Sequence, residues 1–274
     1  MPSKARGTEP SGFDEPSGFD EPSGFDESGW FGDDGFWTDY APLLFGGERW
    51  AEAPAVVDAV LALSGAEPGS PVLDMCCGPG RHALEFASRG HPVVGVDITE
   101  PYLEAARDSA SAMGLSAEFV RGDARSWSRP GAFALAVNLY TSFGYFDSKA
   151  EDEAMLARLA ESLEAGGTLV MEMVGKETAA RDFTDGEWFE RDGRLVLTEF
   201  TVVGAWEGLR NRWVFVDGDG RRVDRSWVQR LYAASELRDS LLRSGFASAE
   251  IYGSWAGSPY DQAAERLIAV ARKA

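Results

Sequence analysis

One short stretch constrains the fold of this chain most strongly. In it, an apolar run is followed by an aspartate and then by a glycine-rich turn. It reads VLDMCCGPGRH at residues 72–82, and a helical pattern of apolar residues follows it. The pattern predicts a buried strand, a tight loop and a helix start. Gly78 and Gly80 permit positive φ and place no Cβ before a ligand, while the helix start offers unpaired N–H groups. The stretch is therefore typical of a ligand-binding loop.

Apolar strand-like runs alternate with helical patterns on both sides of this loop. Four runs follow the first, at residues 92–96, 117–120, 133–139 and 168–174, and Pro54 suits the first turn of a helix before it. Near-continuous apolar strands between helices predict an α/β fold with a Rossmann-like, mostly parallel sheet covered on both faces.

The pattern changes after the fifth strand. Residues 194–205, 209–216 and 221–232 alternate apolar and polar side chains, and Asp217–Gly220 is a turn signal. This predicts an antiparallel β meander inserted at about residues 186–233. Two final strands are expected at 249–252 and 267–271.

The N-terminal segment divides into two parts. Residues 10–27 are three copies of Pro-Ser-Gly-Phe-Asp-Glu, and we expect residues 1–29 to form a disordered acidic tail, because one phenylalanine per copy cannot offset the ordering entropy. A short docking tail is the alternative. Residues 30–274 then form the folded domain. The aromatic-rich residues 30–52 are expected either to pack on the sheet or to cover the ligand loop as a lid.

Composition narrows the function. The net charge is −19, of which −8 falls in the first 39 residues, and an acidic surface disfavours nucleic acid. The adjacent cysteines, Cys76 and Cys77, offer no disulfide framework and no zinc spacing, which favours a reducing, cytoplasmic compartment. No apolar run is long enough to span a membrane. Two histidines and scattered carboxylates form no metal-ligand set.

Three successive strands end in a carboxylate and the fourth in an amide: Asp74, Asp97, Asp123 and Asn138. In an open parallel sheet, ligands bind at these carboxyl ends. The loop alone also fits a relaxed dinucleotide fingerprint, so a nicotinamide-dependent oxidoreductase is an alternative. Against it, Asp74 would face a pyrophosphate, and the proline between the glycines removes an N–H group.

In combination, these residues resemble those of class I S-adenosylmethionine-dependent methyltransferases, over about residues 37–274. Asp74 to Gly80 is similar to that family's D-x-x-x-G-x-G loop, followed by Asp97 and by Gly122-Asp123. The resemblance implies a seven-stranded sheet whose last strand, at 267–271, is antiparallel. It also implies contacts with S-adenosylmethionine from the following residues: Asp74, Gly78 and Gly80 at the methionine end, Asp97 at the ribose, Asp123 and Ala124 at the adenine, and Asn138 near the amino-acid end. Cys76 and Ile98 are further candidates for contact with the cofactor.

The aromatic N-terminal segment and the meander are similar to those of the small-molecule branch, such as the glycine and amino-sugar N-methyltransferases. That similarity implies a cover over the cofactor from Tyr40 and Trp50, with Arg49 as a further candidate. After the fourth strand, Asn138-Leu139-Tyr140-Thr141 lacks the two prolines found in methyltransferases of bases and glutamine. We therefore expect a small-molecule acceptor with an oxygen or nitrogen nucleophile. Candidates for contact with the acceptor or for proton transfer are Tyr140, Tyr145 and His82.

Two questions stay open at this level. The same fold is compatible with a cofactor-binding protein that transfers no methyl group. The meander is also a candidate surface for a homodimer, because a small sheet with an exposed apolar face tends to find a partner.

Overall fold

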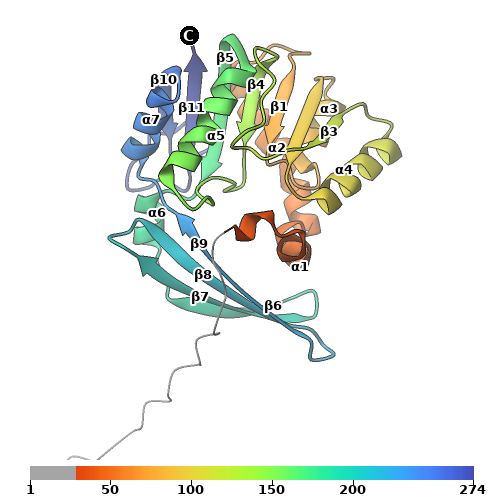
Figure 1. Cartoon of the computed structure of the whole chain (residues 1–274), viewed down its shortest axis with the longest axis vertical. Coiled ribbons are helices and arrows are strands. Elements are labelled where there is room, and N and C mark those ends of the chain that lie inside the picture. The colour runs from red at the N-terminus through yellow and green to blue at the C-terminus, as the bar shows by residue number, and fades with distance from the viewer. Residues whose placement is uncertain (1–28) are drawn as a thin grey trace, which may run out of the picture.

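The computed structural model describes residues 29–274, so the expectations for the repeat at residues 10–27 lie outside the described residues. Figure 1 shows a large sheet flanked by helices and a smaller sheet beside it. The large sheet has seven strands in the order β10-β11-β5-β4-β1-β2-β3. Their bounds are β1 Val72–Met75, β2 Val93–Asp97, β3 Glu118–Arg121, β4 Phe133–Asn138, β5 Leu163–Met173, β10 Phe246–Tyr252 and β11 Leu267–Lys273.

The predicted sheet is confirmed. Strand β1 pairs in parallel with β2 and β4, and β11 runs antiparallel to both β5 and β10. The carboxyl ends of β1, β2, β3 and β4 therefore lie at one edge of the sheet, where the topology places a ligand.

Helices cover both faces of the large sheet. On one face, α5 (Lys149–Ser162) and α7 (Ala234–Arg243) contribute Leu156 and Leu237 to the core cluster that also contains Leu73 of β1. On the other, α2 (Gly47–Ser64), α3 (Arg81–Ser88) and α4 (Glu100–Met113) pack against the opposite side of the same strands. Because successive strand side chains point to opposite faces, a strand covered on both faces is apolar throughout.

The inserted lobe has four strands instead of the expected three. Antiparallel strands β6 (Gly186–Arg191), β7 (Arg194–Val203), β8 (Gly208–Val216) and β9 (Arg222–Arg230) follow each other in space as in sequence. The short edge strand β6 escaped prediction, because Glu187, Glu190 and Arg191 hide its alternation. Charged, short edge strands are a common protection against unwanted pairing. The short helix α6 (Lys176–Arg181) leads into the lobe.

The N-terminal segment lies between the two sheets, as Figure 1 shows for α1. A 3₁₀ turn (Trp30–Gly32) precedes α1 (Asp34–Leu44), and α2 begins at Gly47. The prediction that Pro54 opens this helix was wrong, since Pro54 lies inside α2. The proline costs one backbone hydrogen bond there, but the helix continues because its earlier turns carry Trp50 against the core.

In the part of the chain that the structure describes, no helix combines the length and the apolar character that a membrane span requires.

Candidate active site

The loop between β1 and α3 adopts a left-handed backbone at three positions. Cys76, Gly78 and Gly80 have φ values of 62°, 55° and 82°. A Cβ at Gly80 would approach the Phe119 ring to 3.1 Å, so this glycine lets α3 start close to its neighbours. A Cβ at Gly78 would lie 3.2 Å from the Phe45 ring. The end of the N-terminal segment thus covers the ligand loop.

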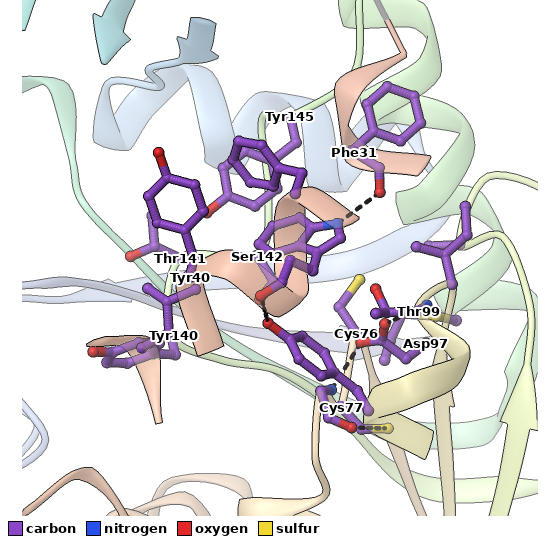
Figure 2. A pocket seen from close by; sticks show the side chains of 18 of the residues that line it. Phe31, Tyr40, Cys76, Cys77, Asp97, Thr99, Tyr140, Thr141, Ser142 and Tyr145 are labelled. Carbon is purple, nitrogen blue, oxygen red and sulfur yellow. Dashed lines mark hydrogen bonds between the residues drawn. The ribbon is translucent and has the colours of Figure 1, made fainter. Parts of the chain in front are cut away.

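A cavity of about 350 Å³ lies between this loop and the aromatic segment, within the size range of small-molecule sites. Figure 2 shows Cys76, Asp97 and Thr99 on one side of it and the rings of Phe31, Tyr40 and Tyr145 on the other. The aromatic side chains that line it come from the N-terminal segment, the segment after β4, helix α4 and the lobe: Trp30, Phe31, Phe36, Trp37, Tyr40, Phe45, Tyr102, Tyr140, Tyr145, Phe146, Trp213 and Trp227.

Most of the predicted site residues line this cavity: Tyr40, Cys76, Gly78, His82, Asp97, Ile98, Asp123, Ala124, Tyr140 and Tyr145. The structure places the others elsewhere. Asp74 and Asn138 are buried at the ends of β1 and β4, with exposed fractions of 2 % and 0 %. Gly80 is enclosed by packing side chains. Trp50 packs against the core cluster on the α2–α4 face of the sheet.

The carboxylate of Asp97 anchors the loop. Its Oδ2 accepts a hydrogen bond from the Gly78 N–H at 2.8 Å, and its Oδ1 accepts one from the Thr99 N–H at 2.9 Å. Burial raises the pKa of Asp97, while these two N–H groups oppose that rise. Each carboxylate oxygen accepts more than one hydrogen bond, so Asp97 retains acceptor capacity on its cavity side.

The carboxylate of Asp123 is engaged by Arg125. The Arg125 Nε lies 3.0 Å from Asp123 Oδ1, and Nη2 lies 2.6 Å from Oδ2. Hydrogen bonds from Arg125 hold the pKa of Asp123 below its usual range. The same guanidinium bonds Glu151 at 2.6 Å and lies over the rings of Phe31 and Phe146. Arg125 therefore ties the end of β3 to the start of α5 and to the N-terminal segment.

The segment after β4 is strained. Tyr140 and Thr141 have φ values of 62° and 60°, a region that costs non-glycine residues free energy. Glu172 of β5 fixes both residues: its Oε2 accepts the Tyr140 N–H at 2.8 Å, and its main-chain oxygen accepts the Thr141 N–H at 3.1 Å. Arg266 pairs with the other carboxylate oxygen at 2.9 Å. Strain that is held in this way is a common feature of functional sites.

Two of the groups predicted for proton transfer, His82 and Tyr145, are poor bases. Burial lowers the pKa of His82 to about 3, with a further decrease caused by the nearby Arg81 charge. Burial also raises the pKa of Tyr145 and of Tyr40 far above the neutral range. Near neutral pH, His82 is an uncharged imidazole and both tyrosines are uncharged phenols.

Sequence reasoning missed two residues of this site. Glu172 stands in the middle of an apolar strand, and a charge at such a position is a signal that was available. Arg81 lines the cavity although it is 5 % exposed. Its position directly after the second loop glycine was the only available signal.

Comparison with known proteins identifies the family. A methyltransferase domain model matches residues 72–167, the span from β1 to β5. The dTDP-3-amino-3,4,6-trideoxy-alpha-D-glucopyranose N,N-dimethyltransferase of Streptomyces venezuelae is 32 % identical over 182 residues, covering 61 % of this chain and 74 % of that protein.

This chain belongs to the class I S-adenosylmethionine-dependent methyltransferases.

Solved structures of such methyltransferases share the fold. Streptomyces venezuelae DesVI superposes with a TM-score of 0.65 at 26 % identity, over 88 % of this chain and 99 % of that chain. The S-adenosylmethionine-bound CalS10, an amino pentose methyltransferase from Micromonospora echinaspora, gives 0.65 at 23 % identity, over 86 % and 96 %. The glycine loop alone was compatible with two cofactors, and membership of this family distinguishes them. The cofactor of this methyltransferase is S-adenosylmethionine, and the nicotinamide alternative is rejected.

The residues of the methyltransferase cavity fit this cofactor. Two buried oxygens directly beside cavity-lining residues, Asp74 Oδ2 next to Met75 and Asn138 Oδ1 next to Leu139, lack a hydrogen-bond partner within residues 29–274. Unsatisfied buried acceptors are costly and rare, and an ammonium group supplies donors directly or through water. Burial, with the nearby Asp97 charge, raises the pKa of Asp74 to about 7. A cation binding there would favour its ionised form.

Proposed function

We propose that this methyltransferase methylates an amino nitrogen of a small metabolite, and that its acceptor is an amino sugar. The observation that carries the choice of nitrogen is the state of two candidate bases in the cavity: burial lowers the pKa of His82 to about 3 and raises the pKa of Tyr145, so neither group readily accepts a proton near neutral pH. A neutral amine already has a free lone pair. A hydroxyl group must lose its proton and therefore needs a base.

The choice of an amino sugar rests on the relatives. The Streptomyces venezuelae relative is named for N,N-dimethylation of a dTDP-linked amino sugar, and CalS10 is described as an amino pentose methyltransferase. The aromatic rings of the cavity are compatible with the apolar face of a sugar ring.

When bound, S-adenosylmethionine supplies an electrophilic methyl group on a positively charged sulfur. The chain aligns the nitrogen lone pair with that methyl group and excludes water from the reaction. The Asp97 and Asp74 carboxylates hold the ribose and ammonium groups, and the segment from Tyr140 to Tyr145 forms the wall next to the acceptor. The nitrogen would gain the methyl group as the carbon–sulfur bond breaks, S-adenosylhomocysteine would leave as the neutral thioether, and the surplus proton on nitrogen would pass to solvent.

We also propose a homodimer through the lobe. Trp188 of β6 and Leu197 of β7 are paired across the strands and are 69 % and 39 % exposed. An exposed apolar pair on an outer sheet face favours burial against a second copy.

The free thiols of Cys76 and Cys77 support a reducing, cytoplasmic compartment.

The acceptor is tested with matched pairs of compounds. The protein is incubated with S-adenosylmethionine and a dTDP-linked sugar that bears an amino group, or with the same sugar bearing a hydroxyl group at that position. We expect S-adenosylhomocysteine and a product heavier by one or two methyl groups from the amine only. Equal methylation of the hydroxyl compound would refute the choice of nitrogen. Tight cofactor binding without turnover of any amine would point to a protein that transfers no methyl group.

A further inference from the structure

A buried acidic side chain lies where the lobe joins the large sheet. Asp152 stands in the first turn of α5 and is 0 % exposed. Its Oδ2 accepts a hydrogen bond from the Tyr232 hydroxyl at 2.8 Å and another from the Arg230 Nε at 3.1 Å. Arg230 is the last residue of β9, and Tyr232 follows two residues later. One carboxylate of α5 therefore holds the chain at the point where it leaves the lobe.

The same part of the chain holds the segment that follows β4. The Arg230 N–H donates to the main-chain oxygen of Gly144 at 2.7 Å. A Cβ at Gly144 would collide with the main-chain oxygen of Arg230, so the two backbones are in direct contact. The Phe143 and Tyr232 rings pack with their centres 5.1 Å apart. Asp152 is thus connected to this segment through both of its hydrogen-bond partners.

The segment held in this way forms one wall of the cavity. Residues 139–142 and 145–146 line the cavity, whereas Phe143 is buried behind them with an exposed fraction of 1 %. Glu172 of β5 fixes the first part of the segment, at the strained Tyr140. Asp152 is connected to its second part, at Phe143 and Gly144. Two buried carboxylates from different elements therefore hold the wall between them.

Stability alone does not account for a charge at this position. Burial raises the pKa of Asp152 to about 6, while Tyr232, Arg230 and the main chain of Phe146 oppose that rise. An aspartate in an unfolded chain has a pKa of about 4, so ionised Asp152 destabilises the folded state near neutral pH. Buried ion pairs add little net stability, and one use of such a pair is to select a single arrangement of its neighbours.

The other charged groups around this network belong to α5 and α7. The Lys149 Nζ lies 5.9 Å from the centre of the Tyr232 ring. Glu153 raises the pKa of the same tyrosine and pairs with Arg243 of α7 at 2.6 Å. Glu153 and Arg243 are partly exposed at the surface, whereas Asp152 is enclosed. This difference makes Glu153 a suitable comparison for Asp152.

We propose that Asp152 is a positioning residue that, through Arg230 and Tyr232, holds residues 140–146 in the conformation that receives the methyl acceptor. The proposal rests on the proposed role of this segment as the wall next to the acceptor, but not on which amine the enzyme methylates. It assigns to Asp152 no contact with the cofactor, since Asp152 does not line the cavity.

Hydrogen exchange measured by mass spectrometry tests the positioning without any acceptor. The wild type and Asp152→Asn are compared at pH 7 with saturating S-adenosylhomocysteine, whose affinity is measured by calorimetry. We expect amides in residues 139–147 to exchange at least about tenfold faster in Asp152→Asn. Exchange in residues 74–82 and the affinity for S-adenosylhomocysteine should not change. Glu153→Gln is the matched control on the same helix and should behave as the wild type does.

Steady-state kinetics separate positioning from a general structural role. With the dTDP-linked amino sugar as the acceptor, Asp152→Asn should raise the KM for the acceptor by about tenfold or more and leave the KM for S-adenosylmethionine unchanged. The ratio of kcat/KM for the acceptor in the wild type to that in Asp152→Asn should fall toward one below about pH 6, where Asp152 becomes protonated. Protonation of the amine affects both proteins equally and does not alter this ratio.

Three results would overturn the proposal. The first is equal exchange of residues 139–147 in the wild type and Asp152→Asn. The second is a lower Tm in this variant together with weaker S-adenosylhomocysteine binding, which would show a general structural role. The third is a ratio of kcat/KM values that does not change with pH.

A second variant serves if Asp152→Asn does not fold. Tyr232→Phe removes one hydrogen bond to Asp152 and keeps the ring that packs on Phe143. It should give a smaller increase in exchange, confined to residues 139–147, and unchanged exchange there would also overturn the proposal. If the wild type does not methylate the amino sugar, the proposed function is contradicted, while the exchange experiment still decides the role of Asp152.

Discussion

The strained pair after β4 gives a prediction in which stability and activity change in opposite directions. Tyr140 and Thr141 both adopt left-handed backbone, and Thr141 is β-branched, which makes the conformation particularly unfavourable. Such a residue costs about 1–2 kcal/mol, whereas glycine adopts this conformation freely. Glycine also makes the unfolded chain more flexible, at a cost of about 0.5–1 kcal/mol. Thr141→Gly should therefore stabilise the protein by about 0.5–1 kcal/mol.

The same substitution should reduce activity. The segment is held by the Glu172 side chain and main chain, and Tyr140 and Thr141 line the cavity. A glycine would free the segment from its single conformation, so the wall beside the acceptor would be less well positioned. We expect kcat/KM to fall by at least about tenfold, which corresponds to about 1.4 kcal/mol of transition-state stabilisation.

A thermal unfolding scan and steady-state kinetics test this prediction together. An increase in stability of about 0.5–1 kcal/mol raises Tm by about 1–4 °C in a domain of this size. Asp192→Gly is the matched control: Asp192 has a φ of 51° in the turn between β6 and β7 and does not line the cavity. It should raise Tm without changing kcat/KM. A lower Tm in Thr141→Gly, or full activity in that variant, would refute the reasoning.

Three further predictions concern the charges around the cavity. The pKa of Asp74 is about 7 in the free protein, and a bound ammonium group would lower it. Binding of S-adenosylmethionine should therefore release a proton below about pH 7, and the affinity should increase as the pH rises toward 7. Calorimetry in two buffers of different ionisation enthalpy measures the released proton, and titrations at several pH values measure the affinity. Since the pKa of His82 is about 3, His82→Gln should leave the shape of the kcat/KM profile from about pH 6 to 9 unchanged, and a lost ionisation in that range would assign a base to His82. Arg125→Gln should raise the KM for S-adenosylmethionine and lower Tm by about 2–4 °C, because Arg125 joins Asp123 to Phe31; an unchanged KM would show that Asp123 is positioned without it.

The sequence was sufficient to predict the large sheet, and most of the residues that it singled out line one cavity. Strands buried on both faces are apolar throughout, and glycines at left-handed positions leave a clear pattern, so residues 72–174 were readable in order. The edge strand β6 could not be predicted, because the charged residues on its exposed face hide the alternation of apolar and polar side chains. The start of α2 was misplaced because proline usually opens a helix, whereas packing of the turn around Trp50 extends this one beyond its proline.

The hydrogen-bond and ion-pair partners of the site residues could not be predicted from the sequence pattern. The sequence pattern does not show that Arg125 engages the Asp123 carboxylate, nor that Asp74 is buried beside the residues that line the cavity. The pairing of Glu172 with the strained segment joins two strands and becomes visible only once their register is known. Such contacts depend on three-dimensional neighbours, and a single sequence records only which residues are available.

The central claim is that the cavity beside Asp97 binds S-adenosylmethionine. Calorimetric titration of the cofactor into the wild type and into Asp97→Asn tests it most directly, because the substitution keeps the size of the side chain and removes its charge. We predict that the wild type binds the cofactor and that Asp97→Asn binds it with an affinity at least about tenfold lower, as expected when hydrogen bonds to a charged group are lost. The circular dichroism spectrum of the variant should match that of the wild type. Equal affinity in the two proteins, or no binding by the wild type, would contradict it.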